Sequence, residues 1–234
     1  MWRDVSSWRA TSTPAKARVR GFSGRGLWAI FLAAILLPAF CLAAKTFVMP
    51  AAEPAKTYPA HDEHPNESVT VALDPYDDAE KARIFSIHYG EIGMLPVFLI
   101  VTNDGNQPIS LVGMRAEFIT ANRSKLYPAS NDDLIRRLSH PEARTSYPLP
   151  FPRSKVKGGV KQEQRDEIQN SQFAARAVEP HSTQAGFLFF DVADVPTPLP
   201  GAHFYLTGVH DAKGNELMYF EVPLEKYLSA PAKP

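Results

Sequence analysis

The chain has 234 residues, and roughly 190 of them follow an apolar N-terminal segment, a length that suits one folded domain. With 21 prolines, 13 glycines and 44% hydrophobic residues, the composition excludes a collagen-like or wholly disordered chain. The single cysteine, Cys41, lies inside the apolar segment, so the folded part has no internal disulfide, cysteine nucleophile or thiolate metal site.

The charge is unevenly distributed along the chain. The 25 basic and 25 acidic residues cancel overall, yet residues 1–26 carry six basic side chains against one acidic side chain. The tail therefore has a net charge of +5, and the remainder has −5. Binding to nucleic acid requires a clustered excess of Lys and Arg that neutralises phosphates, so we predict no nucleic-acid partner for the folded part.

Residues 27–44 form an uncharged apolar run, LWAIFLAAILLPAFCLAA, between the basic tail and Lys45. As a helix rising ~1.5 Å per residue, this run would span about 27 Å, close to the hydrocarbon thickness of a bilayer. We therefore predict a transmembrane signal anchor at 27–44 and a cytoplasmic tail at 1–26. The expected location is the inner membrane, with a single pass and a periplasmic or otherwise extracytoplasmic C-terminal domain. A cleaved signal peptide and a buried core helix are the alternatives.

Residues 45–68 contain four prolines and no periodic apolar pattern, which predicts a semi-extended linker that acts as a stalk. His61 and His64 lie three residues apart within it. A linker gives two histidines no rigid geometry, so we expect no more than adventitious metal binding there.

After the linker, the sequence predicts one all-β domain at 69–228 and a disordered tail at 229–234. β-branched and aromatic residues indicate about seven strands. No strand–helix–strand alternation is present, so a parallel α/β sheet is not expected. The predicted strands are residues 69–73, 83–89, 95–102, 109–120, 185–192, 203–209 and 216–224.

Two connections predict antiparallel pairs. Asp104-Gly105 supplies residues that adopt the positive φ angles of a tight turn, so the strands on either side are expected to form a hairpin. The last two strands are joined by residues 211–215, where Gly214 suits a left-handed conformation. Short connections of this kind favour antiparallel neighbours.

Residues 121–176 interrupt the β pattern, and their length predicts a partly helical insert with structure of its own. Ser130, followed by acidic and then basic residues, predicts a short capped helix. Residues 161–175 have a helix-forming composition, with Ile168 and Phe173 as the apolar anchors, although a mobile polar loop fits the same composition.

The predicted strand at 185–192 contains four consecutive large apolar residues, Phe187, Leu188, Phe189 and Phe190. Side chains of a strand alternate between two faces, so both faces of this strand must be covered. We expect one face to meet an opposing sheet. The other face is expected to be covered by the insert or by a partner protein.

Two segments resemble immunoglobulin-like β-sandwich modules of exported proteins. The first is the apolar strand LPVFLIVTN at 95–103, which is followed by a turn and the sequence PISL at 108–111. The second is the polar turn EPHST at 179–183 before the apolar strand GFLFFD at 186–191. The chain is similar to uncharacterised membrane-anchored bacterial envelope proteins and, more distantly, to late-embryogenesis-abundant and telokin-like extracellular sandwich domains. The resemblance implies an immunoglobulin-like antiparallel β-sandwich and brings no catalytic residues.

Two sets of side chains are candidate metal ligands. An acidic cluster in LDPYDDAEK could bind calcium through its oxygens, but it lacks the Gly and Glu of an EF-hand loop and also fits a solvated turn. A histidine with two methionines is the soft ligand set of exported copper carriers, although core packing also explains both methionines. The two sets are Asp74, Asp77, Asp78 and Glu80, and His88, Met94 and Met114.

The sequence shows no nucleophile paired with a base. Ser86, Ser110 and Ser182 lie in no G-x-S-x-G or S-x-x-K motif, and histidines such as His181 and His203 have no partner identifiable from sequence. We therefore predict no enzyme activity, no catalytic residue, no metal site and no cofactor. The predicted function is a non-catalytic, membrane-tethered extracytoplasmic binding or structural module that engages a protein partner in the cell envelope. The alternative is an exported metal or small-ligand carrier that uses one of the two candidate sets.

Overall fold

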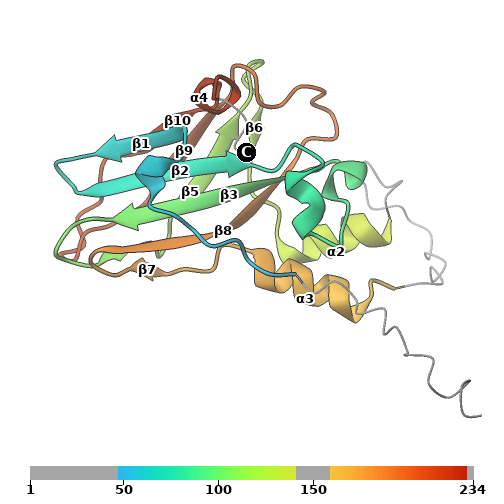
Figure 1. The fold of residues 1–234 in the computed structure, drawn as a ribbon, viewed down its shortest axis with the longest axis horizontal. Coiled ribbons are helices and arrows are strands. Elements are labelled where there is room, and N and C mark those ends of the chain that lie inside the picture. Colours follow the sequence, from blue (N-terminus) through green and yellow to red (C-terminus); the bar gives the residue numbers. More distant parts are fainter. Residues whose placement is uncertain (1–46, 141–158, 231–234) are drawn as a thin grey trace, which may run out of the picture. The chain divides into compact units, whose positions relative to one another are not determined.

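The structure is a computed structural model that describes residues 47–140 and 159–230 (Figure 1). The predicted cytoplasmic tail and the predicted anchor at 27–44 lie outside the described residues. Within the described ranges, no helix combines the length and the apolar character needed to cross a bilayer.

The described residues fold into two four-stranded sheets and a two-stranded ribbon, in which every strand pair is antiparallel (Figure 1). The first sheet has the order β1-β2-β3-β8, and the second has the order β10-β9-β5-β6. The arrangement is compatible with a β-sandwich and confirms a mainly antiparallel β fold. The first sheet contains β1 (Ala60–His64), β2 (Val69–Pro75), β3 (Met94–Asn103) and β8 (Ser182–Asp191). The second contains β5 (Arg115–Ile119), β6 (Lys125–Leu126), β9 (His203–Thr207) and β10 (Phe220–Pro223).

Short elements connect the sheets. The ribbon joins β4 (Ile109–Ser110) to β7 (Ala177–Val178). The α-helices are α2 (Asn131–Ser139), α3 (Gln162–Ser171) and α4 (Glu225–Leu228), and the 3-10 helices are η1 (Ala55–Thr57), η2 (Lys81–Ile84) and η3 (Tyr89–Ile92).

The first sheet is covered on both faces. In β8, Leu188 and Phe190 belong to the apolar layer shared with the second sheet, whereas Phe187 and Phe189 belong to a separate outer layer. All four residues are at most 9% exposed. The alternation of a strand therefore serves two cores here, and the prediction that both faces of this strand are covered is confirmed.

Three segments build the outer layer of the first sheet. The chain at 47–58 lies on it, as do the connection between β2 and β3 and the two insert helices. Leu134 of α2 and Ile168 of α3 are fully buried, and Phe85 packs against Phe187 with ring centroids 4.9 Å apart. The insert supplies part of the cover, and the two other segments supply the rest.

The insert also pairs with the free edge of β8. The Ala129 N–H donates to the Phe189 carbonyl at 2.7 Å, and the Phe173 N–H donates to the Phe187 carbonyl at 3.0 Å. A Cβ atom at Gly186 would lie 2.5 Å from the Phe173 Cα, so only glycine fits this close approach. The edge of the sheet is thus closed by the chain itself.

Both predicted insert helices form. Helix α2 begins after Ser130, whose hydroxyl accepts the Asp133 N–H while the Asp133 carboxylate accepts the Ser130 N–H, each at 3.2 Å. This reciprocal capping confirms the helix start that the sequence indicates. Helix α3 lies within the predicted 161–175 range.

The strand predicted at 83–89 is wrong. The chain there forms η2, a bend and η3. Phe85, Ile87 and Tyr89 are nevertheless buried in the outer layer of the first sheet. These three apolar residues occupy alternate positions, as in a strand. Here the alternation comes from side-chain packing of an irregular segment, without backbone pairing to a neighbouring strand.

The hairpin predicted at Asp104-Gly105 is also wrong, because β3 pairs with β2 and β8 and the chain then leaves the first sheet. The Asn103 side chain organises this turn. Its Oδ1 accepts the Gly105 N–H at 2.9 Å, and its amide donates to the carbonyls of Gln107 and Val178 at 2.8 and 3.1 Å. Gly105 does not adopt a positive φ, so the conformation that favours a tight hairpin is not used.

Two further predictions need correction. The strand predicted at 109–120 divides into β4 and β5 at a turn where Gly113 has a φ of 86°. The linker predicted at 45–68 is folded from residue 47 onward, since it contains η1 and β1 and the Ala55 N–H donates to Thr102 Oγ1 at 2.8 Å. Its prolines lie between short elements, where a missing N–H is tolerated. The predicted pairing of the last two strands is confirmed.

Candidate functional site

In the predicted acidic cluster around Asp74, a lysine ammonium takes the place expected for a metal ion. Asp74, near the end of β2, accepts a hydrogen bond from the Lys81 ammonium at 2.5 Å. The ammonium also lies 5.0 and 4.8 Å from the ring centroids of Tyr76 and Tyr227. Burial and then the Asp74 charge raise the pKa of Tyr76 to about 12, which keeps its hydroxyl neutral. Lys81 therefore supplies the positive charge that a metal ion would bring to Asp74.

The other members of this cluster have separate partners. Asp77 accepts the Tyr227 hydroxyl at 2.7 Å, and burial together with this hydrogen bond raises the pKa of Tyr227. Asp78 accepts the Glu80 N–H at 3.1 Å, and Glu80 pairs with Arg83 at 2.6 Å. In the part of the chain that the structure describes, no group of three or more His, Cys, Asp or Glu residues could hold a metal ion.

The second predicted ligand set is dispersed. His88 is exposed, whereas Met94 is buried in the outer layer of the first sheet. Met114 packs against the other core, the layer between the two sheets. Because the two methionines lie on opposite sides of the first sheet, the structure does not bring the three side chains together.

The serines and histidines of the described residues form no nucleophile–base pair. The Ser86 hydroxyl donates to Glu167, and His181 Nε2 lies 3.1 Å from the Asn106 side-chain oxygen. His203 Nδ1 lies 2.9 Å from Glu221 Oε1. Among the described residues, no serine hydroxyl is hydrogen-bonded to a histidine ring.

A buried carboxylate, Glu167, fastens α3 to the segment before η3. The residue is 3% exposed. Its oxygens accept the Ser86 N–H at 2.7 Å, the Ser86 hydroxyl at 2.5 Å and the Ile87 N–H at 3.1 Å. Burial and then the Glu167 charge raise the pKa of Tyr89. No sequence pattern distinguishes Glu167 from the other acidic residues of this polar helix, so the sequence alone does not indicate this anchor.

The outer face of the second sheet carries aromatic and polar side chains. In β9, His203 and Tyr205 are partly exposed and alternate with the buried Phe204. Tyr219, just before β10, is 51% exposed, and its ring centroid lies 6.1 Å from that of Tyr205. The His203 ring lies on the other side of Tyr205 at 6.4 Å, with an interplanar angle of 19°. The three rings form a row.

Carboxylates border this row on both sides. In the strand register, Tyr205 lies between Glu117 of β5 and Glu221 of β10. Glu221 accepts the Tyr205 hydroxyl at 2.7 Å, and this hydrogen bond, with a smaller contribution from burial, raises the pKa of Tyr205 to about 12. Glu117 pairs with Lys125 at 3.0 Å. We call this surface the tyrosine face; it consists of Glu117, His203, Tyr205, Tyr219 and Glu221.

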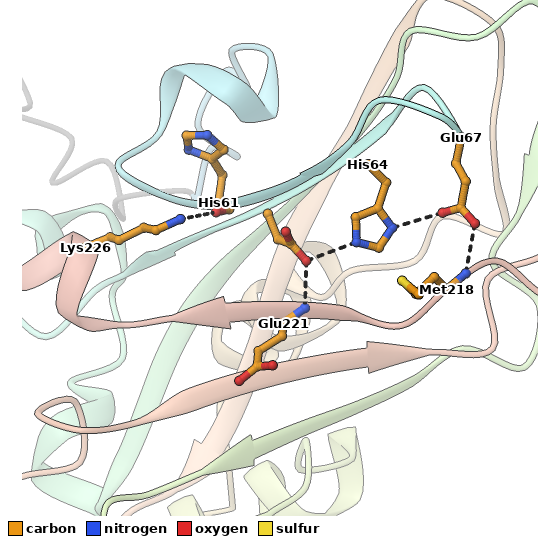
Figure 2. Close-up of polar contacts among 7 residues, drawn as sticks. His61, His64, Glu67, Met218, Glu221 and Lys226 are labelled. Atoms are coloured by element: carbon orange, nitrogen blue, oxygen red, sulfur yellow. Dashed lines mark hydrogen bonds and ion pairs between the residues drawn. The ribbon is translucent and has the colours of Figure 1, made fainter.

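The tyrosine face adjoins a polar seam between β1 and β10, shown in Figure 2. Asp62 Oδ2 accepts the Glu221 N–H at 2.9 Å, and Glu67 Oε1 accepts the Met218 N–H at 2.9 Å. The His64 ring lies between the carboxylates, with Nε2 3.2 Å from Asp62 and Nδ1 2.9 Å from Glu67. We call Asp62, His64 and Glu67 the β1–β10 clamp.

The clamp is a hydrogen-bonding device and not a metal site. The two nitrogens of His64 bind different carboxylates, and the ring stacks on Phe220 with centroids 4.2 Å apart. His61 is engaged elsewhere, since its Nδ1 lies 2.6 Å from the Tyr58 carbonyl oxygen. The sequence assigned both histidines to a linker, and the strand that positions them became visible only in the structure.

A comparison with known protein families finds none that matches this chain, and a search of curated proteins finds no match either. The geometry of the described residues is therefore the basis for inferring function. The sequence of β9, HFYLT, contains the alternation that indicates an exposed aromatic face. The neighbouring positions of Tyr219 and Glu221 depend on strand pairing across the sheet.

Proposed function

We propose that the chain is a non-catalytic, membrane-tethered extracytoplasmic module that binds a protein partner of the cell envelope through the tyrosine face. The observation that carries the proposal is the exposure of Tyr219 beside Tyr205 on a sheet face that no second apolar layer of the described residues covers. Tyrosine is enriched in protein interfaces because it offers a large ring and a polar tip.

The packing of the face favours recognition. The hydroxyl of Tyr205 and the Nδ1 of His203 both contact Glu221, so the two rings are held before any partner arrives. Side chains that are already ordered lose less conformational entropy on binding. The central part of the face is therefore preorganised, and Tyr219 extends it toward the solvent.

The strand order supports the immunoglobulin-like class for the fold. If β2, β3, β5, β6, β8, β9 and β10 are equated with strands A, B, C, C′, E, F and G, the two sheets have the orders A-B-E and G-F-C-C′. Immunoglobulin-like sandwiches also separate A, B and E from C, F and G. Strand β1 and the helical insert are additions to this plan.

The alternative of a metal or small-ligand carrier has less support. Lys81 neutralises Asp74, and the partners of the remaining acidic residues lie within the protein. His88 is exposed, while Met94 and Met114 belong to different cores. Neither candidate set offers converging ligands in the described residues.

Site-specific photo-crosslinking tests partner binding. A photoreactive phenylalanine analogue replaces Tyr219 in the full chain in its native membranes, and Glu163, an exposed residue of α3, is the matched control position. We expect one stoichiometric protein adduct from position 219 and none from position 163. If neither position gives an adduct, or if both give the same mixture, the tyrosine face is not the binding surface.

The tether is tested separately by mass spectrometry of the protein isolated from membranes. An uncleaved anchor at 27–44 predicts that peptides containing Trp8 are recovered. A mature N-terminus near Lys45 would show that the segment is a cleaved signal peptide.

A further inference from the structure

We infer that the proton carried by His64 controls the tyrosine face through the β1–β10 clamp. This inference rests on the proposed function, because it assigns a regulator to the same face. With a doubly protonated ring, His64 bridges Asp62 and Glu67 and holds the edge of β10 in place. When the ring loses a proton, the clamp loosens and the β10 side of the face loses its order.

The first step concerns the edge of β10. The backbone N–H groups of Met218, two residues before β10, and of Glu221, within β10, donate to the side-chain carboxylates of Glu67 and Asp62. These carboxylates take the place of carbonyl groups in a neighbouring strand (Figure 2). These two bonds bracket Tyr219 in the sequence. The position of Tyr219 on the face therefore depends on both carboxylates.

The second step concerns the number of donors on His64. A neutral imidazole has one N–H donor and one acceptor nitrogen, whereas an imidazolium has two donors. Both ring nitrogens lie within hydrogen-bond distance of a carboxylate, and an ionised carboxylate only accepts. Only the charged ring satisfies both contacts, since the neutral ring turns a lone pair toward one carboxylate oxygen.

The charged groups around His64 show that no other cation pairs with the clamp carboxylates in the described residues. Among the described residues, no lysine or arginine forms an ion pair with Asp62 or Glu67. Glu63, also on β1, belongs to the opposite face of the strand by alternation. From β10, the Phe220 ring is neutral, and the Glu221 carboxylate is engaged by Tyr205 and His203.

Another cation among the described residues at the seam, Lys226, donates to the His61 carbonyl oxygen at 3.1 Å (Figure 2). It therefore does not substitute for His64. Loss of one His64 proton leaves the carboxylates of Asp62 and Glu67 without a positive partner. The His64 side chain is only 15% exposed, so water replaces the lost interactions poorly.

The sign of the effect follows from these contacts. The stabilisation of the seam is present while His64 carries both ring protons, and it is lost when the ring gives one of them up. Glu221 links this loss to the face, because its backbone N–H binds Asp62 while its carboxylate positions Tyr205 and His203. A rise in pH is therefore expected to weaken partner binding.

Amide hydrogen exchange tests the clamp in the full chain reconstituted in lipid nanodiscs. In the native protein, the protection factors of the Met218 and Glu221 amides should fall on the order of tenfold as the pH rises, as expected for the loss of a hydrogen bond to a charged group. His64→Phe keeps a ring on Phe220 but removes both nitrogens, so its protection factors should be low and independent of pH.

A second variant and a control guard against a folding defect. Glu67→Gln can still accept the Met218 N–H through Oε1, while its amide nitrogen, in the place of Oε2, can donate to the Nδ1 of a neutral His64, so the fall in protection with pH should disappear. His181→Asn removes an exposed histidine outside the clamp and should keep the native response. An unchanged response in both His64→Phe and Glu67→Gln overturns the inference.

Photo-crosslinking from position 219 at the same pH values separates the two proposals. Adduct yield that falls with pH in the native chain but not in Glu67→Gln supports control by His64. A yield that is constant with pH while an adduct forms overturns the control and leaves the proposed binding surface intact. No adduct at any pH, with the amides responding as expected, overturns the proposed binding surface and with it the control of that surface.

Discussion

The outer faces of the two sheets have opposite environments. That of the first sheet lies under a second apolar core containing Phe187 and Phe189, whereas that of the second sheet carries Tyr205 and Tyr219 in contact with solvent. The sequences of β8 and β9 already differ in this respect, since GFLFF has no polar residue to turn outward and HFYLT has one at every second position. Alternation within a strand thus indicates how many of its faces need cover.

The difference also separates stability from recognition. The cover of the first sheet is fixed by the buried Glu167 and by the backbone bonds from Ala129 and Phe173, so it is part of the fold. The second sheet needs no such cover, because its outer side chains pair with one another across the strands. Substitutions should therefore affect stability on one face and binding on the other.

The largest expected effect is that of Phe187→Ala. Because Phe187 is fully buried under the outer layer, the substitution should lower the free energy of unfolding by about 3–5 kcal/mol, measured by denaturant titration. Phe190→Ala, on the inner face, is the matched comparison and should cost about as much. A loss below about 1 kcal/mol at Phe187 would mean that the outer layer contributes little packing.

Glu167→Ala should have the next largest effect. The substitution removes the acceptor of the part-buried Ser86 N–H and of the buried Ile87 N–H, which should cost about 2–3 kcal/mol of unfolding free energy. Amide exchange in α3 should increase at the same time, because the helix loses its anchor. Native protection in α3 with unchanged stability would contradict a role for Glu167 in fastening the cover.

Gly186→Ala tests the close approach of the insert to β8. The new Cβ would lie 2.5 Å from the Phe173 Cα, so the insert must shift, at a cost of about 1–3 kcal/mol. Gly90→Ala is a suitable control, since nothing lies within 4 Å of a Cβ there. Equal stabilities of the two variants would contradict the tight contact between the insert and the strand.

The smallest effect is expected on the tyrosine face, where the measurement is a titration. The hydrogen bond to Glu221 raises the pKa of Tyr205 to about 12, so Glu221→Gln should lower this pKa toward the usual value near 10. Because the chain has eight tyrosines, the titration is followed for Tyr205 alone, by the NMR chemical shift of the ring carbon that bears its hydroxyl, measured against pH. The sign for stability follows from this raised pKa. The contribution of Tyr205 to the free energy of unfolding is fully present below the pKa that the tyrosine has in the unfolded chain, and it is lost as the pH rises from there through the pKa in the folded protein. An unaltered Tyr205 titration in the variant would show that Glu221 does not hold the hydroxyl.

The sequence by itself determined the features that depend on local patterns. The residues after Ser130 encode a capped helix, Gly214 permits the turn between β9 and β10, and the apolar run at 187–190 requires cover on both faces. Each of these signals lies within a few consecutive residues. Local backbone preference and side-chain alternation are therefore enough to read them.

Tertiary structure decided the features in which contacts between distant residues override a local sequence pattern. Asp104-Gly105 favours a hairpin, but β3 gains two long neighbours in β2 and β8, and the Asn103 side chain closes a different turn. Residues 83–89 alternate like a strand, yet their side chains fill the outer core without backbone pairing. The clamp at His64 likewise exists only because β1 meets β10. Such contacts join residues more than 100 positions apart, and their energies depend on burial and partner geometry that no short stretch of sequence contains.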